Sequence, residues 1–247
     1  MLSVSEHTVP WPELDAPVVV AQITDVHMGP STPARTVRKA IEIAADKADI
    51  LVFTGDAVNV FPFPAKRLAA MLAQVDLPKV GVLGNHDHLA GPRRISGWFE
   101  DAGMRMLHNQ SLQLGDLTIV GLDDGKTRHA DPEAAFAGVD EPRPTLVLAH
   151  YPMDADQIAP LGGRLILSGH THGGQAQLPG TTLVSLWSGE AYIHGFYDVG
   201  EARLYVSAGL GHGPLRFGCP PELALFRLDP AAAVASSTQA PTTVRTR

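Results

Sequence analysis

Short apolar runs and amphipathic segments alternate along the N-terminal part of the chain. The apolar runs at 17–23, 49–55 and 79–84 are rich in branched side chains, which favours buried strands. Each run precedes a segment whose apolar residues recur with helical spacing, and these segments span 33–48, 64–75 and 92–103. The repeated order of a strand and then a helix predicts a sheet that is covered by helices.

The second half of the chain differs, because strand-like runs follow one another with shorter connections. The expected strands lie within 104–109, 112–124, 145–150, 164–170, 191–197, 202–209 and 222–228. The tetrapeptide LGDL at 114–117 is typical of a hairpin turn. We therefore expect an α/β fold in which two sheets pack face to face with helices outside. We assign it to a single domain over 17–228, after an N-terminal extension at 1–16 and before a disordered tail at 229–247.

Polar side chains that can bind metals follow five of the expected strands. They are Asp25 with His27, Asp56, Asn85, His150, and His170 with His172. Side chains alternate faces along a strand, so Asp25 and His27 point the same way. Open α/β sheets bind ligands outside the carboxyl ends of their strands, and flanking glycines permit close backbone approach. The strand ends can therefore meet in one site.

These side chains offer oxygen and nitrogen ligands for two divalent metal ions. The seven residues give four contacts to each ion if one carboxylate bridges the pair, and Asp56 is central in chain order. A mixed histidine and carboxylate set suits Mn, Fe or Zn better than Ca or Mg. The alternative is a set of unrelated buried or capping residues, which the order and the placement at strand ends disfavour.

The ordered motifs DxH, GDxxN, GNHD, HxP and GHTHGGQ resemble those of the calcineurin-like metallophosphoesterases. The C-terminal stretch YVSAGLG…PLRFGCPPELALFRL looks like the bacterial YkuE-type phosphodiesterases, and the resemblance covers about residues 17–228. It implies a four-layer α/β/β/α sandwich of two mixed sheets flanked by helices. It also implies one metal site of Asp25, His27, Asp56 and His172, and a second of Asp56, Asn85, His150 and His170. His86 takes the position of the family's catalytic histidine.

The resemblance implies a phosphohydrolase, and we expect direct attack on phosphorus by a hydroxide that bridges two metal ions. His86 would donate to a phosphoryl oxygen or protonate the leaving group. Many members of the family end the GDxxD motif with an aspartate that pairs with this histidine, whereas this chain has Asn59. The Asn59 amide can still orient the ring, and Asp87, Asp123 and Asp124 are alternatives for that role.

Two further polar residues are candidates for substrate contact. His88 follows His86 in the same loop, and an exposed histidine without a role is an equal alternative. Arg216 suits bidentate contact with phosphate oxygens, and a structural salt bridge is its equal alternative. Phe61 and Phe63 could form an apolar lip for a lipid or aromatic substrate, although core packing is the commoner role of such residues.

Composition limits the classes of binding partner and the cellular location that we expect. The formal net charge of -7 and the pI of about 5.8 argue against binding to nucleic acid, so we expect a small phosphorylated substrate. The single cysteine, Cys219, excludes an internal disulfide and a thiolate metal cluster. The N-terminal residues lack the pattern of a signal peptide, and no apolar run is long enough for a membrane span. We expect a cytoplasmic protein, with peripheral membrane association left open, and the sequence identifies no protein partner.

The function predicted from the sequence is a dinuclear metal-dependent phosphohydrolase, with phosphodiesters as the favoured substrates. A phosphomonoesterase and a nucleotide or lipid-sugar pyrophosphatase are alternatives on the same site. An alternative of another class is a non-catalytic metal-binding scaffold. The presence of His86 and of every ligand residue favours an enzyme.

Overall fold

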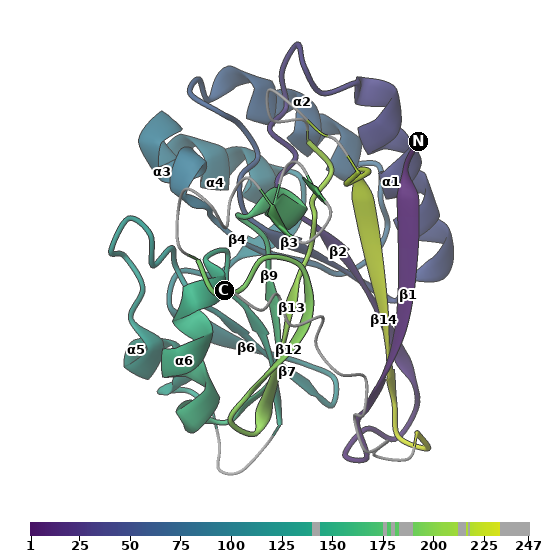
Figure 1. Ribbon diagram of the computed structural model, residues 1–247, viewed down its shortest axis with the longest axis vertical. Coiled ribbons are helices and arrows are strands. Elements are labelled where there is room, and N and C mark those ends of the chain that lie inside the picture. The colour runs from purple at the N-terminus through teal and green to yellow at the C-terminus, as the bar shows by residue number, and fades with distance from the viewer. Residues whose placement is uncertain are drawn as a thin grey trace.

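Two six-stranded sheets face each other in the computed structural model of the chain, and helices cover their outer faces (Figure 1). The structure describes residues 1–139, 144–174, 177–178, 181–182, 190–211, 216 and 218–232. Both sheets contain parallel and antiparallel pairs of strands.

The first sheet has the strand order β1-β14-β2-β3-β4-β5. Its strands are β1 (Ser3–Pro10), β14 (Glu222–Asp229), β2 (Val18–Ile23), β3 (Ile50–Thr54), β4 (Lys79–Val82) and β5 (Met104–Met106). Strands β2 to β5 run parallel, and β14 runs antiparallel to β2. The carboxyl ends of β2, β3 and β4 therefore lie at one edge of this sheet.

The second sheet has the strand order β12-β13-β9-β8-β7-β6. Its strands are β12 (Gly195–Val199), β13 (Ala202–Val206), β9 (Gly163–Ser168), β8 (Thr145–Leu148), β7 (Leu117–Gly121) and β6 (Gln110–Leu114). The predicted hairpin is present, because Leu114 pairs with Leu117 across a tight turn between β6 and β7. A separate small ladder joins β10 (Gln177–Leu178) to β11 (Thr181–Thr182).

The helices divide between the two outer faces. Four belong to the side of the first sheet: α1 (Ala34–Lys47), α2 (Phe63–Leu72), α3 (Asn85–Ala90) and α4 (Pro92–Asp101). The short helices α5 (Pro132–Phe136) and α6 (Ala155–Ile158) cover the second sheet. Three 3₁₀ turns are η1 (Pro152–Asp154), η2 (Ala159–Leu161) and η3 (His172–Gly174).

Three apolar cores separate these layers. The first joins one face of the first sheet to α1, α2 and α4, the second lies between the sheets, and the third joins the second sheet to α5 and α6. Strand β3 illustrates the reason, because Leu51 and Phe53 enter the first core while Ile50 and Val52 enter the second. A strand that is buried on both faces reads as a continuous apolar run. The predicted four-layer α/β/β/α architecture is confirmed.

The segment expected as an N-terminal extension differs from that expectation, because Ser3–Pro10 forms the edge strand β1. It pairs in parallel with β14, from Ser3 opposite Glu222 to Pro10 opposite Asp229. The inward side chains include polar Ser5 and His7, so the strand lacks an apolar pattern. Ser5 Oγ donates to the Glu222 carboxylate at 2.7 Å, and His7 lies against the rings of Tyr205 and Phe226. Specific partners in other strands, which the local sequence does not reveal, hold β1 in place.

The tail predicted to be disordered begins at Asp229, the last residue of β14, and its residues 233–247 lie outside the described residues. Within the part of the chain that the structure describes, no helix has the length and apolar character needed to cross a bilayer. The limits of the domain proposed from the sequence stay a prediction.

Candidate active site

The structure brings all seven predicted ligand residues to the facing strand ends of the two sheets. Asp25 and His27 follow β2, Asp56 follows β3, Asn85 follows β4, His150 follows β8, and His170 and His172 follow β9. Five of them have a positive φ, which is uncommon outside glycine: Asp25, His27, Asp56, His170 and His172. The chain therefore turns sharply at these residues as each strand ends.

One group of side chains joins the end of β2 to the end of β9. His27 Nε2 lies 3.0 Å from His172 Nε2, and His172 Nε2 lies 3.5 Å from Asp25 Oδ1. Two hydrogen bonds fix the carboxylate of Asp25, because the backbone N–H of His170 and the Thr24 hydroxyl both donate to it. Atoms that share one cation at 2.0–2.2 Å are separated by about 3 Å, so this group has the spacing of a metal site.

A second group joins the ends of β3 and β4 to those of β8 and β9. His150 Nε2 lies 3.2 Å from Asp56 Oδ2 and 3.2 Å from Asn85 Oδ1. Asn85 Oδ1 also lies 2.9 Å from His170 Nδ1. These four side chains converge on one position, and the two sheets contribute equally to them.

Asp56 takes part in both groups through one oxygen atom. Its Oδ2 lies 3.6 Å from His27 Nε2 in the first group and 3.2 Å from His150 Nε2 in the second. Its Oδ1 instead accepts a hydrogen bond of 2.9 Å from the backbone N–H of His86. The carboxylate is thereby held with a single oxygen between the two groups.

Burial and mutual charge set the ionisation of these residues. Burial lowers the pKa of His27, and it lowers the pKa of His172 to about 3, so both imidazoles are neutral and can act as ligands. Burial alone would raise the pKa of Asp56, but neighbouring His150 and His27 hold that pKa below its usual range. Burial opposes a charge on His150, yet the Asp56 carboxylate raises its pKa well above the ordinary value. The Asp56 carboxylate therefore stays ionised.

The donor set fits divalent cations. The Nδ1 of His150 is 2.8 Å from the carbonyl oxygen of Thr54 and donates to it, so Nε2 faces the oxygens of Asp56 and Asn85. A divalent cation would take the place of the proton on Nε2, because metal ligands bind in their deprotonated form. The described residues include no lysine or arginine that forms an ion pair with Asp25 or Asp56, although both carboxylates are buried. Metal ions would supply the missing positive charge.

The candidate catalytic histidine lies beside the shared carboxylate, at the first turn of α3. His86 and His27 have ring centroids 5.0 Å apart, and a ring nitrogen of His86 is close to the ligand atoms of His27 and Asp56. His86 Nδ1 donates to the main-chain carbonyl oxygen of Asn59 at 2.7 Å. The residue at position 59 thus orients the ring through its backbone, which every amino acid carries.

Asp87 and Asp123, two alternatives for orienting His86, have other partners. Asp87 is buried and accepts from the backbone N–H groups of Ala57 and Gly84, which ties the loops after β3 and β4 together. Burial and the charge of Asp56 raise the pKa of Asp87 to about 7. Asp123 accepts from His88 at 2.7 Å, so His88 points to the end of β7 instead of the ligand cluster.

Arg216 is held by the main chain of loops near the cluster. Its guanidinium donates to the main-chain carbonyl oxygens of Ala208, Gly209 and Cys219. The backbone N–H groups of Leu210 and Gly211 in turn donate to the carbonyl oxygens of Thr24 and Asp25. Arg216 therefore supports the loop that packs against Asp25, it forms no salt bridge among the described residues, and its contact with phosphate oxygens stays a prediction.

Glu190 is a site residue that the sequence did not indicate. Its carboxylate lies 3.4 Å from His170 Nε2 and accepts from Lys126 Nζ at 3.1 Å. A carboxylate on the far nitrogen of a ligand histidine fixes the tautomer and the orientation of the ring. No strand-end motif surrounds Glu190, so only the fold brings it to His170.

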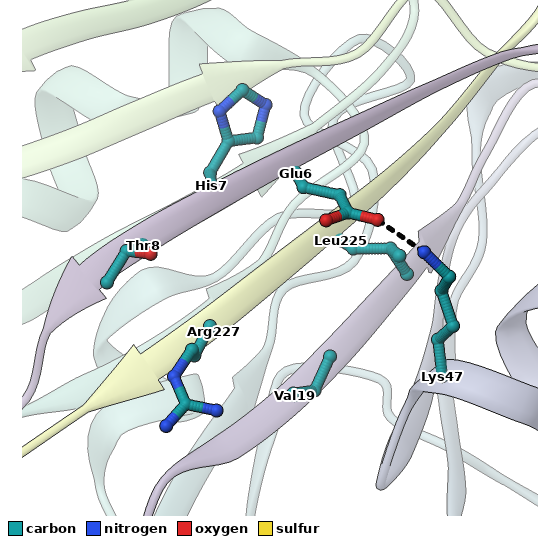
Figure 2. A pocket seen from close by; sticks show the side chains of 7 residues that line it. All are labelled: Glu6, His7, Thr8, Val19, Lys47, Leu225 and Arg227. Carbon is teal, nitrogen blue, oxygen red and sulfur yellow. Dashed lines mark hydrogen bonds and ion pairs between the residues drawn. The ribbon is translucent and has the colours of Figure 1, made fainter.

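A hollow of about 500 Å³ lies elsewhere, over β1, β14 and β2 (Figure 2). Its lining residues are Glu6, His7, Thr8, Val19, Lys47, Leu225 and Arg227. Glu6 and Lys47 form an ion pair of 2.6 Å across it. It contains none of the candidate ligands, so the strand-end cluster is the candidate active site.

Comparison with known proteins agrees with this geometry. Residues 18–174 match the family model of the calcineurin-like phosphoesterases. The chain belongs to this family. It is 33% identical over 229 residues to an uncharacterized metallophosphoesterase of Campylobacter jejuni, which covers 88% of this chain and 60% of that protein. It is 31% identical to the uncharacterized metallophosphoesterase YkuE of Bacillus subtilis over 224 residues, covering 85% of this chain and 78% of YkuE.

Two further relatives add to the comparison. The UDP-2,3-diacylglucosamine pyrophosphatase LpxG of Chlamydia trachomatis is 28% identical over 272 residues, covering 84% of this chain and 82% of LpxG. The crystal structure of TT1561 of Thermus thermophilus has a TM-score of 0.56 at 14% identity, covering 78% of this chain and 90% of TT1561, and supports the fold. The chain spans about 60% of the length of the Campylobacter relative. The predicted family is confirmed.

The packing around Gly169 leads to a first prediction. A Cβ atom at this position would lie 2.0 Å from Asp25 Oδ2 and 2.3 Å from Thr24 Oγ1, so Gly169→Ala must displace the Asp25 carboxylate. We expect kcat/KM for a phosphoester to fall about tenfold or more, because small misplacements in a site are costly. Gly97→Ala is the matched control, because a Cβ at Gly97 in α4 meets nothing within 4 Å. Equal kcat/KM values for the two folded variants would contradict this account of Gly169.

Proposed function

We propose that the chain is a dinuclear phosphodiesterase that holds two divalent metal ions, Mn, Fe or Zn, at the strand-end cluster. Asp25, His27, Asp56 and His172 would hold one ion, and Asp56, Asn85, His150 and His170 would hold the other. The observation that carries the proposal is Asp56 Oδ2, which lies within 3.6 Å of one ligand group and 3.2 Å of the other. The mixed imidazole, carboxylate and amide set suits these metals.

The chain's own residues have defined tasks in this proposal. Divalent cations, when bound, would polarise the phosphoryl oxygens and favour the ionisation of water at neutral pH. The ligand side chains position the phosphorus for direct displacement, without a covalent bond between substrate and enzyme. His86, held at Nδ1 by the Asn59 carbonyl, presents Nε2 to a phosphoryl oxygen or to the leaving group. Asp56 fixes the same loop by accepting from the His86 backbone.

A pyrophosphatase is the second candidate for the same site. The support for it is the relationship to LpxG, whose name gives a nucleotide-linked lipid sugar as its substrate. Hydrolysis of a pyrophosphate also breaks a bond at a phosphorus that carries a second ester-like substituent, so the same residues serve both reactions. A phosphomonoesterase has no specific support in the site, and a small phosphorylated substrate stays the expected partner. The cytoplasmic location expected from the sequence also stays a prediction.

The metal content of variants tests whether Asp56 is a ligand of both ions. Chelation should abolish hydrolysis, and Mn, Zn or Fe should restore it. Wild-type protein reconstituted with Mn should hold about two ions per chain, and Asn85→Ala about one, because Asn85 belongs to one group only. Asp56→Ala should hold fewer ions than Asn85→Ala, since it weakens both groups. Elemental analysis of folded, gel-filtered protein measures this order, and equal metal loss in the two variants would remove the bridging role of Asp56.

Substrate preference tests the reaction class. We expect the Mn-loaded or Zn-loaded chain to hydrolyse bis(p-nitrophenyl) phosphate with a higher kcat/KM than p-nitrophenyl phosphate, and to be inactive without metal. A nucleoside diphosphate sugar tests the pyrophosphatase alternative under the same conditions. A preference for the monoester would overturn the proposed diesterase, and a preference for the diphosphate would select the second candidate.

The hydrogen bond from His86 to the Asn59 carbonyl predicts that removing the Asn59 side chain costs less activity than removing the His86 side chain. His86→Ala should lower kcat about 10²–10⁴-fold with metal content retained, because it removes a positioned donor or acid. Asn59→Ala keeps the carbonyl that orients the ring, so its loss in kcat should be smaller by about tenfold or more. Steady-state kinetics on the diester, with metal analysis of each variant, measure both. A loss in Asn59→Ala that matches His86→Ala would mean that the amide side chain orients the ring.

A further inference from the structure

An exposed apolar cluster lies beside the candidate active site. Four of the seven large hydrophobic residues that are exposed in the described part of the chain occur here: Val60, Phe61, Phe63 and Leu89. Phe61 is 72% exposed, Phe63 is 68% exposed and Leu89 is 75% exposed. Apolar side chains that gather on a surface mark an interaction site more often than single exposed ones. We call these four residues the apolar face.

The apolar face is joined directly to the active-site loop. Val60 and Phe61 follow Asn59, whose carbonyl oxygen holds the ring of His86. Leu89 lies three residues after His86 on α3, and residues at this spacing share a side of a helix. Helices α2, α3 and α4, which carry or adjoin these residues, lie together in the upper part of Figure 1. Whatever binds the apolar face is therefore brought to the candidate catalytic histidine.

Prolines and aromatic contacts stiffen this face. Phe61 and Phe63 flank Pro62, which is buried at the start of α2, and Pro64 follows. Phe63 contacts Trp98 of α4 with ring centroids 6.3 Å apart, and the Arg94 guanidinium lies 5.8 Å from the centre of the Phe63 ring. The exposed rings are thus held outward on a backbone with restricted freedom, which reduces the entropy lost on binding.

Exposed basic side chains lie on the helices that carry or adjoin the apolar face. Lys66 and Arg67 lie three and four residues after Phe63, on the same side of α2, and both are exposed. Arg93 and Arg94 are exposed in the first turn of α4, and the acidic residues Glu100 and Asp101 lie at the opposite end of that helix. Four cations on α2 and α4, one of them over the Phe63 ring, contrast with a chain whose formal net charge is -7.

We propose that the apolar face and these four cations dock on an anionic lipid bilayer, with the strand-end cluster facing the membrane surface. Aromatic and aliphatic side chains enter the boundary between headgroups and acyl chains, while lysine and arginine contact anionic headgroups. An anionic surface repels the remainder of this acidic chain, so the charge distribution also selects one orientation. A second copy of the chain would instead bring the same four cations together at its two-fold axis, which is unfavourable. Docking does not depend on hydrolysis.

Vesicle binding tests the proposal with the full chain. We expect the wild-type protein to sediment with vesicles of phosphatidylcholine containing about a third phosphatidylglycerol at low salt, and much less with phosphatidylcholine alone or at high salt. Arg93→Gln/Arg94→Gln should weaken the partition coefficient about tenfold or more, because each basic residue near an anionic surface contributes measurably. Phe61→Ser/Phe63→Ser should weaken it to a similar extent through lost apolar insertion.

A matched control removes the same charge from another helix. Arg38→Gln/Lys39→Gln neutralises two adjacent exposed basic residues of α1 and should leave the partition coefficient within about twofold of wild type. Arg93→Gln/Arg94→Gln and Arg38→Gln/Lys39→Gln should hydrolyse a soluble diester as the wild type does, and Phe61→Ser/Phe63→Ser should stay folded with its metal content retained, which separates loss of docking from loss of fold. Absence of vesicle binding by the wild type, or equal binding by wild type and Phe61→Ser/Phe63→Ser, would overturn the proposal. A dimer in solution that Phe61→Ser/Phe63→Ser dissolves would also overturn it, by assigning the face to a second copy.

Discussion

Two buried carboxylates without a lysine or arginine partner, Asp25 and Asp56, define the interior of this site within the described residues. An ionised carboxylate in such surroundings costs several kcal/mol unless hydrogen bonds or opposite charge compensate it. Backbone N–H groups of His86 and His170 supply part of that compensation, and the converging side chains could hold cations that supply the rest. Each ligand group draws residues from both sheets, so bound metal would also tie the two sheets together. The ions that the proposed hydrolysis requires would thereby also stabilise the packing of the two sheets at these strand ends.

The backbone at the strand ends is adapted to this arrangement. Successive loops continue the hydrogen bonding of the sheet beyond its strands, because the backbone N–H groups of Asp25 and His27 donate to the carbonyl oxygens of Gly55 and Asp56. Ligand residues with positive φ then turn their side chains toward the gap between the sheets. Gly84 has a related role, since a Cβ there would lie 2.3 Å from Asp56 Oδ1. The glycines beside the ligands are thus required by contacts between neighbouring loops.

The sequence predicted the parts that depend on local patterns. Apolar periodicity identified the layers, and the order of polar residues at strand ends identified the seven residues that the structure brings together. It did not predict β1, because the inward residues Ser5 and His7 are polar and their partners are distant in sequence. The sequence also did not predict what orients His86, because a main-chain carbonyl does so and every residue has one. Glu190 and Arg216 act through contacts that depend on how the loops pack, and residue type alone does not specify them.

One loop, residues 55–63, connects the candidate active site to the apolar face. It carries Asp56, whose oxygen lies between the two ligand groups, and Asn59, whose carbonyl holds His86. It ends in Phe61 and Phe63, which stand exposed beside basic residues of α2 and α4. Asp87 anchors the inner part of the loop through the N–H of Ala57, so movement of the exposed part is opposed close to the ligands. The apolar face and the carbonyl that orients His86 therefore lie on one loop, and a substrate held at that face would lie close to a candidate acid whose ring is already oriented.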